Sequence, residues 1–270
     1  MKGQELAEAL QSGRRVYGTL IVSTSPHWPV VVNSLGLDFV FIDTEHIPIQ
    51  RDTLSWMCRT YGALGLAPIV RIPEPDPFQA CMVLDGGASG IIVPYVETAH
   101  QVRVLQGAAK LRPLKGRRLT EILDGTSNLE LALAQYLGEH NEDHVLIVNI
   151  ESRPAMEALD EIVAVPGLDG VLIGPHDLSV SLGIPEQYDN PKFDEAVRTI
   201  ISKARAAGIG AGIHYSGKLE REVAWAKAGA NLIVHSSDIT AFAQGMHADI
   251  HRIRQALGDA KAAGGGGAKI

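Results

Sequence analysis

Short apolar runs rich in β-branched residues alternate along the chain with longer amphipathic stretches. The clearest two runs cover residues 145–148 and 170–173, and each is followed by a carboxylate, Glu151 or Asp177. Runs of this length and composition are typical of buried parallel strands. The stretch between them, 153–165, spaces its apolar residues for one face of a helix. The pattern predicts a strand–helix–strand unit with both carboxylates at one edge of a sheet.

The same alternation continues through the whole chain. We expect strands at residues 16–22, 38–42, 67–70, 90–93, 145–148, 170–173, 209–213 and 231–234. We expect helices at residues 5–10, 26–35, 52–63, 75–84, 97–111, 153–165, 191–207, 218–228 and 240–257. Repeated strand–helix units of this number predict a closed parallel barrel. The longest irregular segment, 113–142, is expected to be a functional loop or an added helix over the site.

The composition limits the class of protein. With 270 residues, of which 46% are hydrophobic and 20% charged, the chain can form one barrel domain, expected over residues 1–258, followed by a flexible Gly-rich tail over residues 259–270. The net charge of −7 and the lack of a basic run argue against a nucleic-acid partner. No apolar run reaches ~18 residues and no signal sequence is recognisable, so we expect a cytoplasmic protein with no membrane partner. The two cysteines, Cys58 and Cys81, have no metal-type spacing and are expected to be reduced thiols.

Ionisable side chains gather at the predicted C-terminal ends of the strands. The set consists of Asp43, Glu45, His46, Arg71, Asn149, Glu151, His176, Asp177, His214 and His235. Taken singly, such a carboxylate is often a helix cap, and such a histidine is often a surface or core residue. In a barrel, however, all these ends meet at one mouth, where ligands bind. Their joint presence there favours a functional site.

Two carboxylates without a thiolate suit a hard octahedral cation. Glu151 and Asp177 could hold Mg²⁺, Mn²⁺ or Co²⁺ and leave several positions for substrate and water. Because histidines are also expected at the mouth, a softer metal remains an alternative. On the opposite strands, Arg71 can stabilise a developing oxyanion, and Asp43 can orient His46 as a base.

Several stretches of the chain resemble the HpcH/HpaI aldolase family. They are residues 38–48 (DFVFIDTEHIP), 69–73 (IVRIP), 87–96 (GASGIIVPYV) and the stretch 150–183, which contains VPGLDGVLIGPHDLSVSLG. The similarity extends over about residues 18–258. It implies an α/β fold, the (β/α)8 TIM barrel of the phosphoenolpyruvate/pyruvate type. It also implies a metal-dependent (class II) pyruvate aldolase that is a homo-oligomer, a hexamer or trimer, with its last helix exchanged between neighbours.

The resemblance implies a role for each matched residue at the metal. Glu151 and Asp177 would be the metal ligands. Pyruvate would chelate the metal, and its carboxylate would bind the backbone amides of His176 and Asp177 in the turn that begins with Gly174 and Pro175. No Schiff-base lysine is needed, in agreement with the lack of a lysine at any predicted strand end.

The resemblance also implies the groups that handle charge and protons. Arg71 would hold the keto oxygen and stabilise the enolate, and His46, oriented by Asp43, would act as acid and base. The implied reaction is the reversible retro-aldol cleavage of a 4-hydroxy-2-oxoacid to pyruvate and an aldehyde. The partners would therefore be small oxoacids and aldehydes.

Among the positions that depart from the family pattern, three are expected to line the substrate pocket. Asn149 stands where the family usually has Gln, His176 where an Ala is common, and His214 where an aliphatic residue is usual. We expect all three to bind substrate. Because these residues line the pocket rather than the metal, we expect them to affect the choice of substrate more than the metal chemistry.

Other functions remain open at the level of the sequence. The same metal site could serve a decarboxylase, or a lyase acting on an acyl-CoA or citryl-type substrate, whose phosphates could follow a basic track made of Arg112, Lys115, Arg117 and Arg118. A hydrolase could use the histidines of the mouth. A non-catalytic acid-binding barrel is a further alternative, although metal binding alone would not require Asp43, His46 and Arg71.

Overall fold

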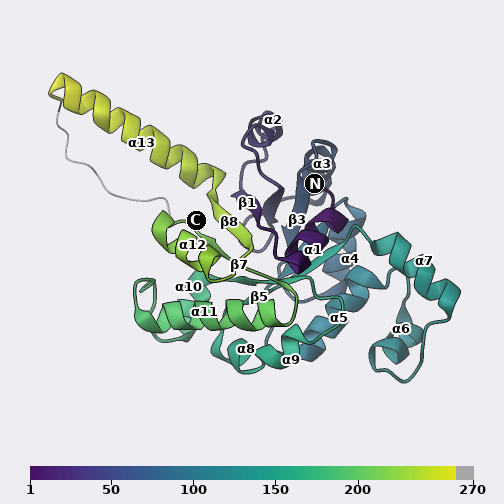
Figure 1. Ribbon diagram of the computed structural model, residues 1–270. Helices are drawn as coiled ribbons and strands as arrows, with labels where there is room; N and C mark the ends of the chain where they lie inside the picture. The colour runs from purple at the N-terminus through teal and green to yellow at the C-terminus, as the bar shows by residue number, and fades with distance from the viewer. Residues whose placement is uncertain (260–270) are drawn as a thin grey trace.

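The computed structural model describes residues 1–259, which form a closed barrel of eight parallel strands (Figure 1). The strands are β1 (Val16–Ile21), β2 (Phe39–Asp43), β3 (Ala67–Arg71), β4 (Gly90–Val93), β5 (Val145–Ile150), β6 (Gly170–Ile173), β7 (Gly210–Tyr215) and β8 (Leu232–Ser237). Each strand pairs with the next in sequence, and β8 pairs with β1. The predicted (β/α)8 barrel is confirmed. The predicted tail lies, from residue 260 on, outside the described residues.

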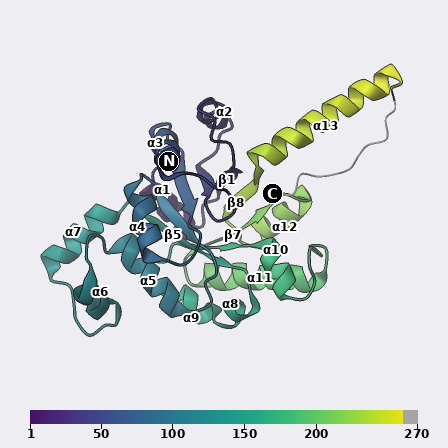
Figure 2. The same ribbon diagram turned by 180° about the vertical axis from the view of Figure 1, so that it is seen from behind.

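Helices connect the strands and surround the barrel (Figures 1 and 2). They are α1 (Gly3–Ser12), α2 (Trp28–Asn33), α3 (Arg51–Ala63), α4 (Pro77–Asp85), α5 (Ala99–Lys110), α6 (Gly116–Leu123), α7 (Leu131–Asn141), α8 (Arg153–Glu157), α9 (Leu159–Val163), α10 (Pro175–Ser181), α11 (Pro191–Ala206), α12 (Leu219–Lys227) and α13 (Asp238–Leu257). The single helix predicted over residues 153–165 is two helices, because Ala158 leaves helical geometry between them. For the irregular segment 113–142, a functional loop or an added helix over the site was expected. The segment contains two helices, α6 and α7, which contact α5 at the side of the barrel.

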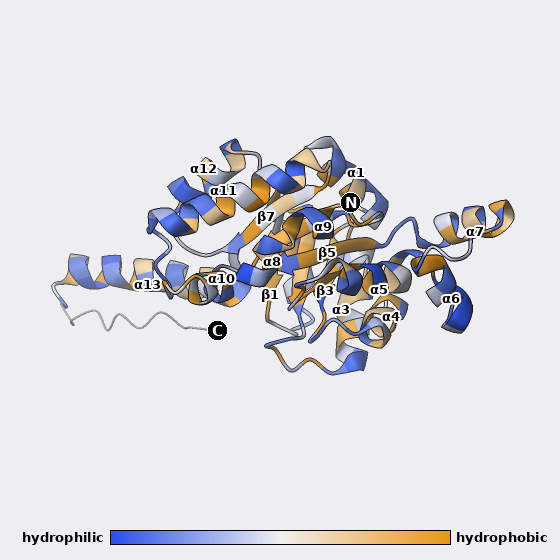
Figure 3. Cartoon of the chain, turned by 90° about the horizontal axis from the view of Figure 1, so that it is seen from below, coloured by the Kyte–Doolittle hydropathy of each residue, from blue (hydrophilic) through white to orange (hydrophobic). Residues whose placement is uncertain are grey.

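Alternation along each strand divides the core into two layers. One set of side chains fills the barrel; on β2 and β3 it includes Phe39, Phe41 and Ile69. The other set packs against the helices and includes Val40 and Ile42 of β2. Figure 3 shows the strands as the most hydrophobic part of the chain, with polar residues on the outer faces of the helices. Because successive side chains of a strand point to opposite faces, a polar residue two positions after an interior one enters the mouth.

α1 closes the N-terminal end of the barrel. Its Leu6 and Leu10 are fully buried in the interior cluster. The carbonyl oxygen of Leu10 accepts hydrogen bonds from Asn231 Nδ2 at 2.8 Å and from Arg205 Nη1 at 2.6 Å. Since this end is covered, the C-terminal ends of the strands are the open mouth of the barrel.

α13 leaves the barrel and projects away from it (Figures 1 and 2). Only Asp238 of this 20-residue helix is buried. That carboxylate accepts hydrogen bonds from the backbone N–H groups of Val22, at 3.0 Å, and Ser23, at 2.9 Å, which fixes the start of the helix to the end of β1. No helix within residues 1–259 is long and apolar enough to cross a membrane.

Candidate active site

The carboxylate of Glu151 is buried at the end of β5, where both of its oxygens are held. Oε1 accepts a hydrogen bond from the backbone N–H of Tyr95 at 2.7 Å, and Oε2 accepts one from Asn149 Nδ2 at 2.9 Å. Burial raises the pKa of Glu151, and the nearby charges of Asp177 and Glu45 raise it further, against the two hydrogen bonds. Burial and the neighbouring negative charges disfavour the charged form of this carboxylate, and a cation bound beside it would stabilise that form.

Asp177 lies in the first turn of α10, immediately after β6. Its side chain is exposed to the mouth, whereas Glu151 is only 5% exposed. β5 and β6 are neighbouring strands with Ile150 opposite Ile173, so the two predicted metal ligands follow adjacent strand ends. Gly174 leaves room between the strand and the carboxylate, since a Cβ there would lie 2.7 Å from Glu151 Oε2.

The residues present fit a hard divalent cation. The two ligands are both carboxylates, and Asn149 Oδ1 nearby is a buried oxygen without a hydrogen-bond partner among the described residues. Within residues 1–259, no group of three or more His, Cys, Asp or Glu side chains is arranged around a common metal position. A protein that supplies only two oxygen ligands leaves the remaining positions to substrate and water, which is typical of Mg²⁺ and Mn²⁺.

Arg71 at the end of β3 is fixed by two carboxylates. Its Nε and Nη2 donate to Asp43 Oδ1 and Oδ2 at 2.9 and 2.7 Å, and Glu45 Oε2 lies 3.0 Å from Nε. Burial by itself would lower the pKa of Arg71, but these carboxylates and Glu151 raise it. The guanidinium group is therefore charged, oriented and close to the metal-ligand side of the mouth.

The structure gives Asp43 a different partner from the one expected. Its carboxylate accepts from Arg71 and from the backbone N–H of Glu45, and within the described chain it makes no hydrogen bond to His46. The ring of His46 lies 3.6 Å from Glu45 Oε1 and is 55% exposed. The reason is position, because Asp43 and Arg71 face each other on neighbouring strands, whereas His46 follows β2 by three residues.

Tyr95 is a site residue that the sequence analysis did not single out. Its backbone has a positive φ of 55°, a conformation that non-glycine residues seldom adopt. A hydrogen bond to Glu45 is the main cause that raises the pKa of its hydroxyl to about 12, and Glu151 and Asp177 contribute. Its residue type and its position two residues after β4 were the only signals in the sequence.

A cavity of about 490 Å³ lies beside the metal ligands, over the ends of β1, β6, β7 and β8. Pro175 and His176 form its side nearest to Asp177. Nδ1 of His176 lies 3.8 Å from Glu186 Oε1, and both residues line the cavity. His214 enters from β7, and Leu20 and Tyr188 also line the space. The structure thus brings two of the three departures, His176 and His214, to one cavity.

His235 does not belong to the mouth. Its side chain points outward to α12, where Nδ1 lies 2.8 Å from Glu222 Oε2, and this contact raises the pKa of the ring. Val234, one position earlier, belongs to the interior cluster, so His235 falls on the opposite face of β8. The expectation that every strand-end histidine enters the mouth was wrong for this residue.

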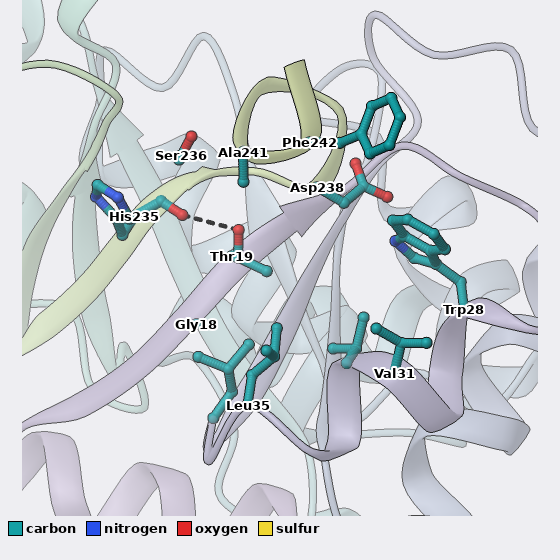
Figure 4. A pocket seen from close by; sticks show the side chains of 12 residues that line it. Gly18, Thr19, Trp28, Val31, Leu35, His235, Ser236, Asp238, Ala241 and Phe242 are labelled. Atoms are coloured by element: carbon teal, nitrogen blue, oxygen red, sulfur yellow. Dashed lines mark hydrogen bonds between the residues drawn. The ribbon is translucent and has the colours of Figure 1, made fainter. Parts of the chain in front are cut away.

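A second cavity lies outside the barrel, between α2 and the start of α13 (Figure 4). Its volume is about 380 Å³ and its walls are mainly apolar, with Trp28 and Val31 from α2, Leu35 just after that helix, and Phe242 from α13. Figure 4 also shows the hydrogen bond from Thr19 Oγ1 to the carbonyl oxygen of His235, 2.8 Å long, which joins β1 to β8 at its edge. The ionisable residues of its lining, His235 and Asp238, are engaged elsewhere: His235 contacts Glu222, and Asp238 accepts hydrogen bonds from the backbone N–H groups of Val22 and Ser23.

Three basic residues of the suggested phosphate track have acidic partners. Arg112 pairs with Asp85, Arg117 with Glu121 and Arg118 with Glu130. A track that binds phosphates needs unpaired positive charge, so these ion pairs give no support to an acyl-CoA substrate.

The comparisons with known proteins agree with this geometry. The family model described as HpcH/HpaI aldolase/citrate lyase matches residues 19–244. The chain is 34% identical, over 209 residues, to 2-keto-3-deoxy-L-rhamnonate aldolase from Salmonella gallinarum, and the match covers 76% of each chain.

Two solved structures share the whole architecture. The HpcH/HpaI aldolase from Desulfitobacterium hafniense superposes with a TM-score of 0.79 at 27% identity, covering 92% of this chain and 96% of its own. The citrate synthase SbnG gives a TM-score of 0.78 at 30% identity, covering 94% and 99%. The predicted class of enzyme, a carbon–carbon lyase that depends on a divalent metal, is confirmed. This chain belongs to the HpcH/HpaI aldolase/citrate lyase family.

Proposed function

We propose that this protein cleaves a 4-hydroxy-2-oxoacid reversibly into pyruvate and an aldehyde. The observation that carries the proposal is that the strand ends bearing the buried Glu151 and Asp177 share the mouth with Arg71, whose guanidinium group is held by Asp43. The named relative acts on 2-keto-3-deoxy-L-rhamnonate, which is a compound of this class because it carries a 2-oxo group, no hydroxyl at C3 and a hydroxyl at C4.

Glu151 and Asp177 would hold the divalent cation, with Mg²⁺, Mn²⁺ and Co²⁺ as candidates. When bound, the cation would act as a Lewis acid on the 2-oxo group. Asn149 orients Glu151 through its amide nitrogen, and its free Oδ1 could accept a hydrogen bond from substrate or water. The backbone N–H groups of His176 and Asp177, in the turn that follows Gly174 and Pro175, would bind the carboxylate of the substrate.

Arg71 would stabilise the negative charge that develops on the oxygen at C2 when the C3–C4 bond breaks. A preorganised guanidinium group is effective in this role because it does not have to reorient during the reaction. Asp43 and Glu45 provide that preorganisation here. His46 remains the proposed proton carrier at C3, and its contact with Glu45 in place of Asp43 would set its orientation.

The test of this function is the exchange of the C3 hydrogens of pyruvate for deuterium, followed by mass spectrometry. We expect exchange with Mg²⁺ or Mn²⁺ and none with EDTA. Glu151→Gln should reduce it by about 10³-fold, because removal of a metal carboxylate forfeits several kcal/mol of charge stabilisation.

Glu157→Gln, on the exposed surface of α8, is the matched control and should exchange at the wild-type rate. Direct titration of both variants with Mn²⁺ then separates loss of metal from loss of fold. Metal binding without any exchange would exclude pyruvate as the nucleophile, and the decarboxylase or citryl-type alternatives would replace this proposal.

We also propose that the protein is a homo-oligomer, a hexamer or trimer, in which a second copy of this chain covers α13. The exposed large side chains of this helix are Phe242, Met246, Ile250, Ile253 and Leu257, spaced three or four residues apart. That spacing places them on one face, which this chain leaves uncovered.

We further propose a cytoplasmic location and no nucleic-acid partner. The net charge of −7 disfavours binding to nucleic acid, and the two free cysteines are typical of a cytoplasmic protein.

A further inference from the structure

His214 has a defined tautomer. Its Nε2 lies 2.9 Å from the carbonyl oxygen of Ser236. A carbonyl oxygen can only accept a hydrogen bond, so Nε2 carries the proton and, in the neutral ring, Nδ1 carries a lone pair. Nδ1 has no hydrogen-bond partner among residues 1–259. A ring held in this way is ready to accept a proton at Nδ1.

The position of His214 connects the proposed enolate site to the adjoining cavity. Its ring packs edge-on against Phe41, with 5.6 Å between centroids, and the guanidinium of Arg71 lies 5.4 Å from the centre of the same Phe41 ring. The ring also lines the cavity whose near wall is Pro175 and His176, next to Asp177. A substrate with C2 near Arg71 would place the atoms beyond C3 toward this cavity.

We propose that His214 is the base that takes the proton of the C4 hydroxyl during cleavage. The proposal rests on the proposed function, since it assigns a step of that reaction. The C4 hydroxyl gives its proton to Nδ1 of His214, the C4–O bond becomes the carbonyl of the aldehyde, and the C3–C4 bond breaks. The electron pair of that bond forms the enolate of pyruvate, whose oxygen faces Arg71. In the condensation direction the protonated ring returns the proton to the new hydroxyl.

The surroundings of His214 keep the ring neutral and able to act. Burial lowers the pKa of the ring, and the charge of Arg71 on β3 lowers it further, against the hydrogen bond to Ser236 and the charges of Asp43 on β2 and Glu222 on α12. The other ionisable groups that line the cavity are His176, Glu186 and the hydroxyls of Tyr188 and Tyr215. We expect the acid limb of kcat/KM for cleavage to lie below pH 6.5, the ordinary pKa of histidine, and to be absent from variants that lack the ring.

The experiment compares two half-reactions in His214→Gln and His214→Leu. Glutamine can still donate to Ser236 and accept from a hydroxyl, but it cannot take up a proton. Cleavage of 2-keto-3-deoxy-L-rhamnonate, measured as pyruvate released, should fall about 10²- to 10⁴-fold in both variants. Metal-dependent deuterium exchange into pyruvate should stay within about threefold of wild type, because enolate formation does not involve the C4 hydroxyl.

His235→Gln is the control, since it removes a histidine from the next strand that points away from the mouth; both rates should remain at the wild-type level. Equal losses of exchange and cleavage in the His214 variants would show a structural role and overturn the assignment, as would full cleavage by His214→Gln. A wild-type enzyme that performs neither half-reaction would instead overturn the proposed function, so the two failures are distinguishable.

Discussion

At the scale of single residues, the position of the Glu151 carboxylate depends on neighbours that approach it closely. Tyr95 and Asn149 hold the two oxygens of Glu151 by hydrogen bonds of 2.7 and 2.9 Å. Gly174 also lies against the Glu151 side chain: a Cβ at Gly174 would be 2.7 Å from Oε2 and 3.1 Å from Cβ of Glu151. The absence of a side chain at Gly174 is therefore part of how Glu151 is positioned.

We predict that Gly174→Ala weakens metal binding without unfolding the protein. The backbone at Gly174 has φ −84°, which alanine adopts without strain, so the only change is displacement of the Glu151 carboxylate. Loss of support around a ligand typically weakens metal affinity about 10- to 100-fold. Isothermal titration with Mn²⁺ measures this effect. Gly138→Ala in α7, where an added Cβ meets nothing within 4 Å, should bind as wild type; equal affinities in all three proteins would contradict the prediction.

The sequence predicted which residues reach the mouth better than how they pair there. Strand alternation accounts for Asp43, Arg71 and His214, which lie two residues beyond interior apolar positions or glycines. Alternation also explains why His235 points outward. The sequence analysis assigned every histidine at a strand end to the mouth without asking which face of the strand it occupies. The Asp43–Arg71 pair depends on the register between β2 and β3, and Tyr95 depends on a left-handed backbone conformation. Neither strand register nor a left-handed backbone conformation produces a periodic pattern in the sequence, so neither feature could be predicted.

At the scale of elements, α1 supports the barrel from the end opposite to the mouth. Leu10 is fully buried against Gly210, where a Cβ would lie 2.7 Å from Leu10 Cδ2. The carbonyl of Leu10 bonds to Asn231 and Arg205, which tie α1 to the start of β8 and the end of α11. In barrels of this kind, residues at the N-terminal end contribute to stability and those at the C-terminal end to catalysis.

We predict that Leu10→Ala lowers the free energy of unfolding by about 2–5 kcal/mol, because it leaves a cavity in a closed core. The rate constant of pyruvate exchange per folded molecule should be unchanged, since the mutated side chain lies far from the mouth. Urea denaturation and an assay of pyruvate exchange below the transition measure the two quantities. Leu131→Ala, at an 86% exposed position, should alter neither. A large loss of exchange in folded Leu10→Ala would show that the two ends are coupled.

Periodicity was sufficient for the elements themselves. All eight strands and most of the helices were predicted because each carries its own apolar face. The break at Ala158 and the short helix α10 were not predicted, and for 113–142 a loop or one added helix over the site was expected in place of two helices. α6 has only eight residues and none of them is buried, and an apolar face over so short a segment is not enough to predict a helix. The division into α8 and α9 is a local change of backbone angle within one continuous apolar pattern.

At the scale of the whole molecule, α13 is the element whose position the rest of the chain does not explain. It begins at Asp238, which is tied to the end of β1, and then extends away from the barrel (Figure 1). A long helix with an apolar face exposed to water is unfavourable, because burial of such a face contributes about 25 cal/mol per Å². A second copy of the chain that covers this face would provide the missing burial.

We predict that Met246→Asp, which places a charge in the middle of the apolar face of α13, dissociates the oligomer. Burial of an unpaired carboxylate in an apolar contact costs several kcal/mol, enough to lower an association constant by about 10³-fold or more. Light scattering after gel filtration measures the mass of each species at micromolar concentration. Gln244→Asp introduces the same charge two residues away, on the opposite side of the helix, and should remain assembled. A wild-type protein that elutes as a monomer, or a Met246→Asp variant of unchanged mass, would show that another copy does not cover α13.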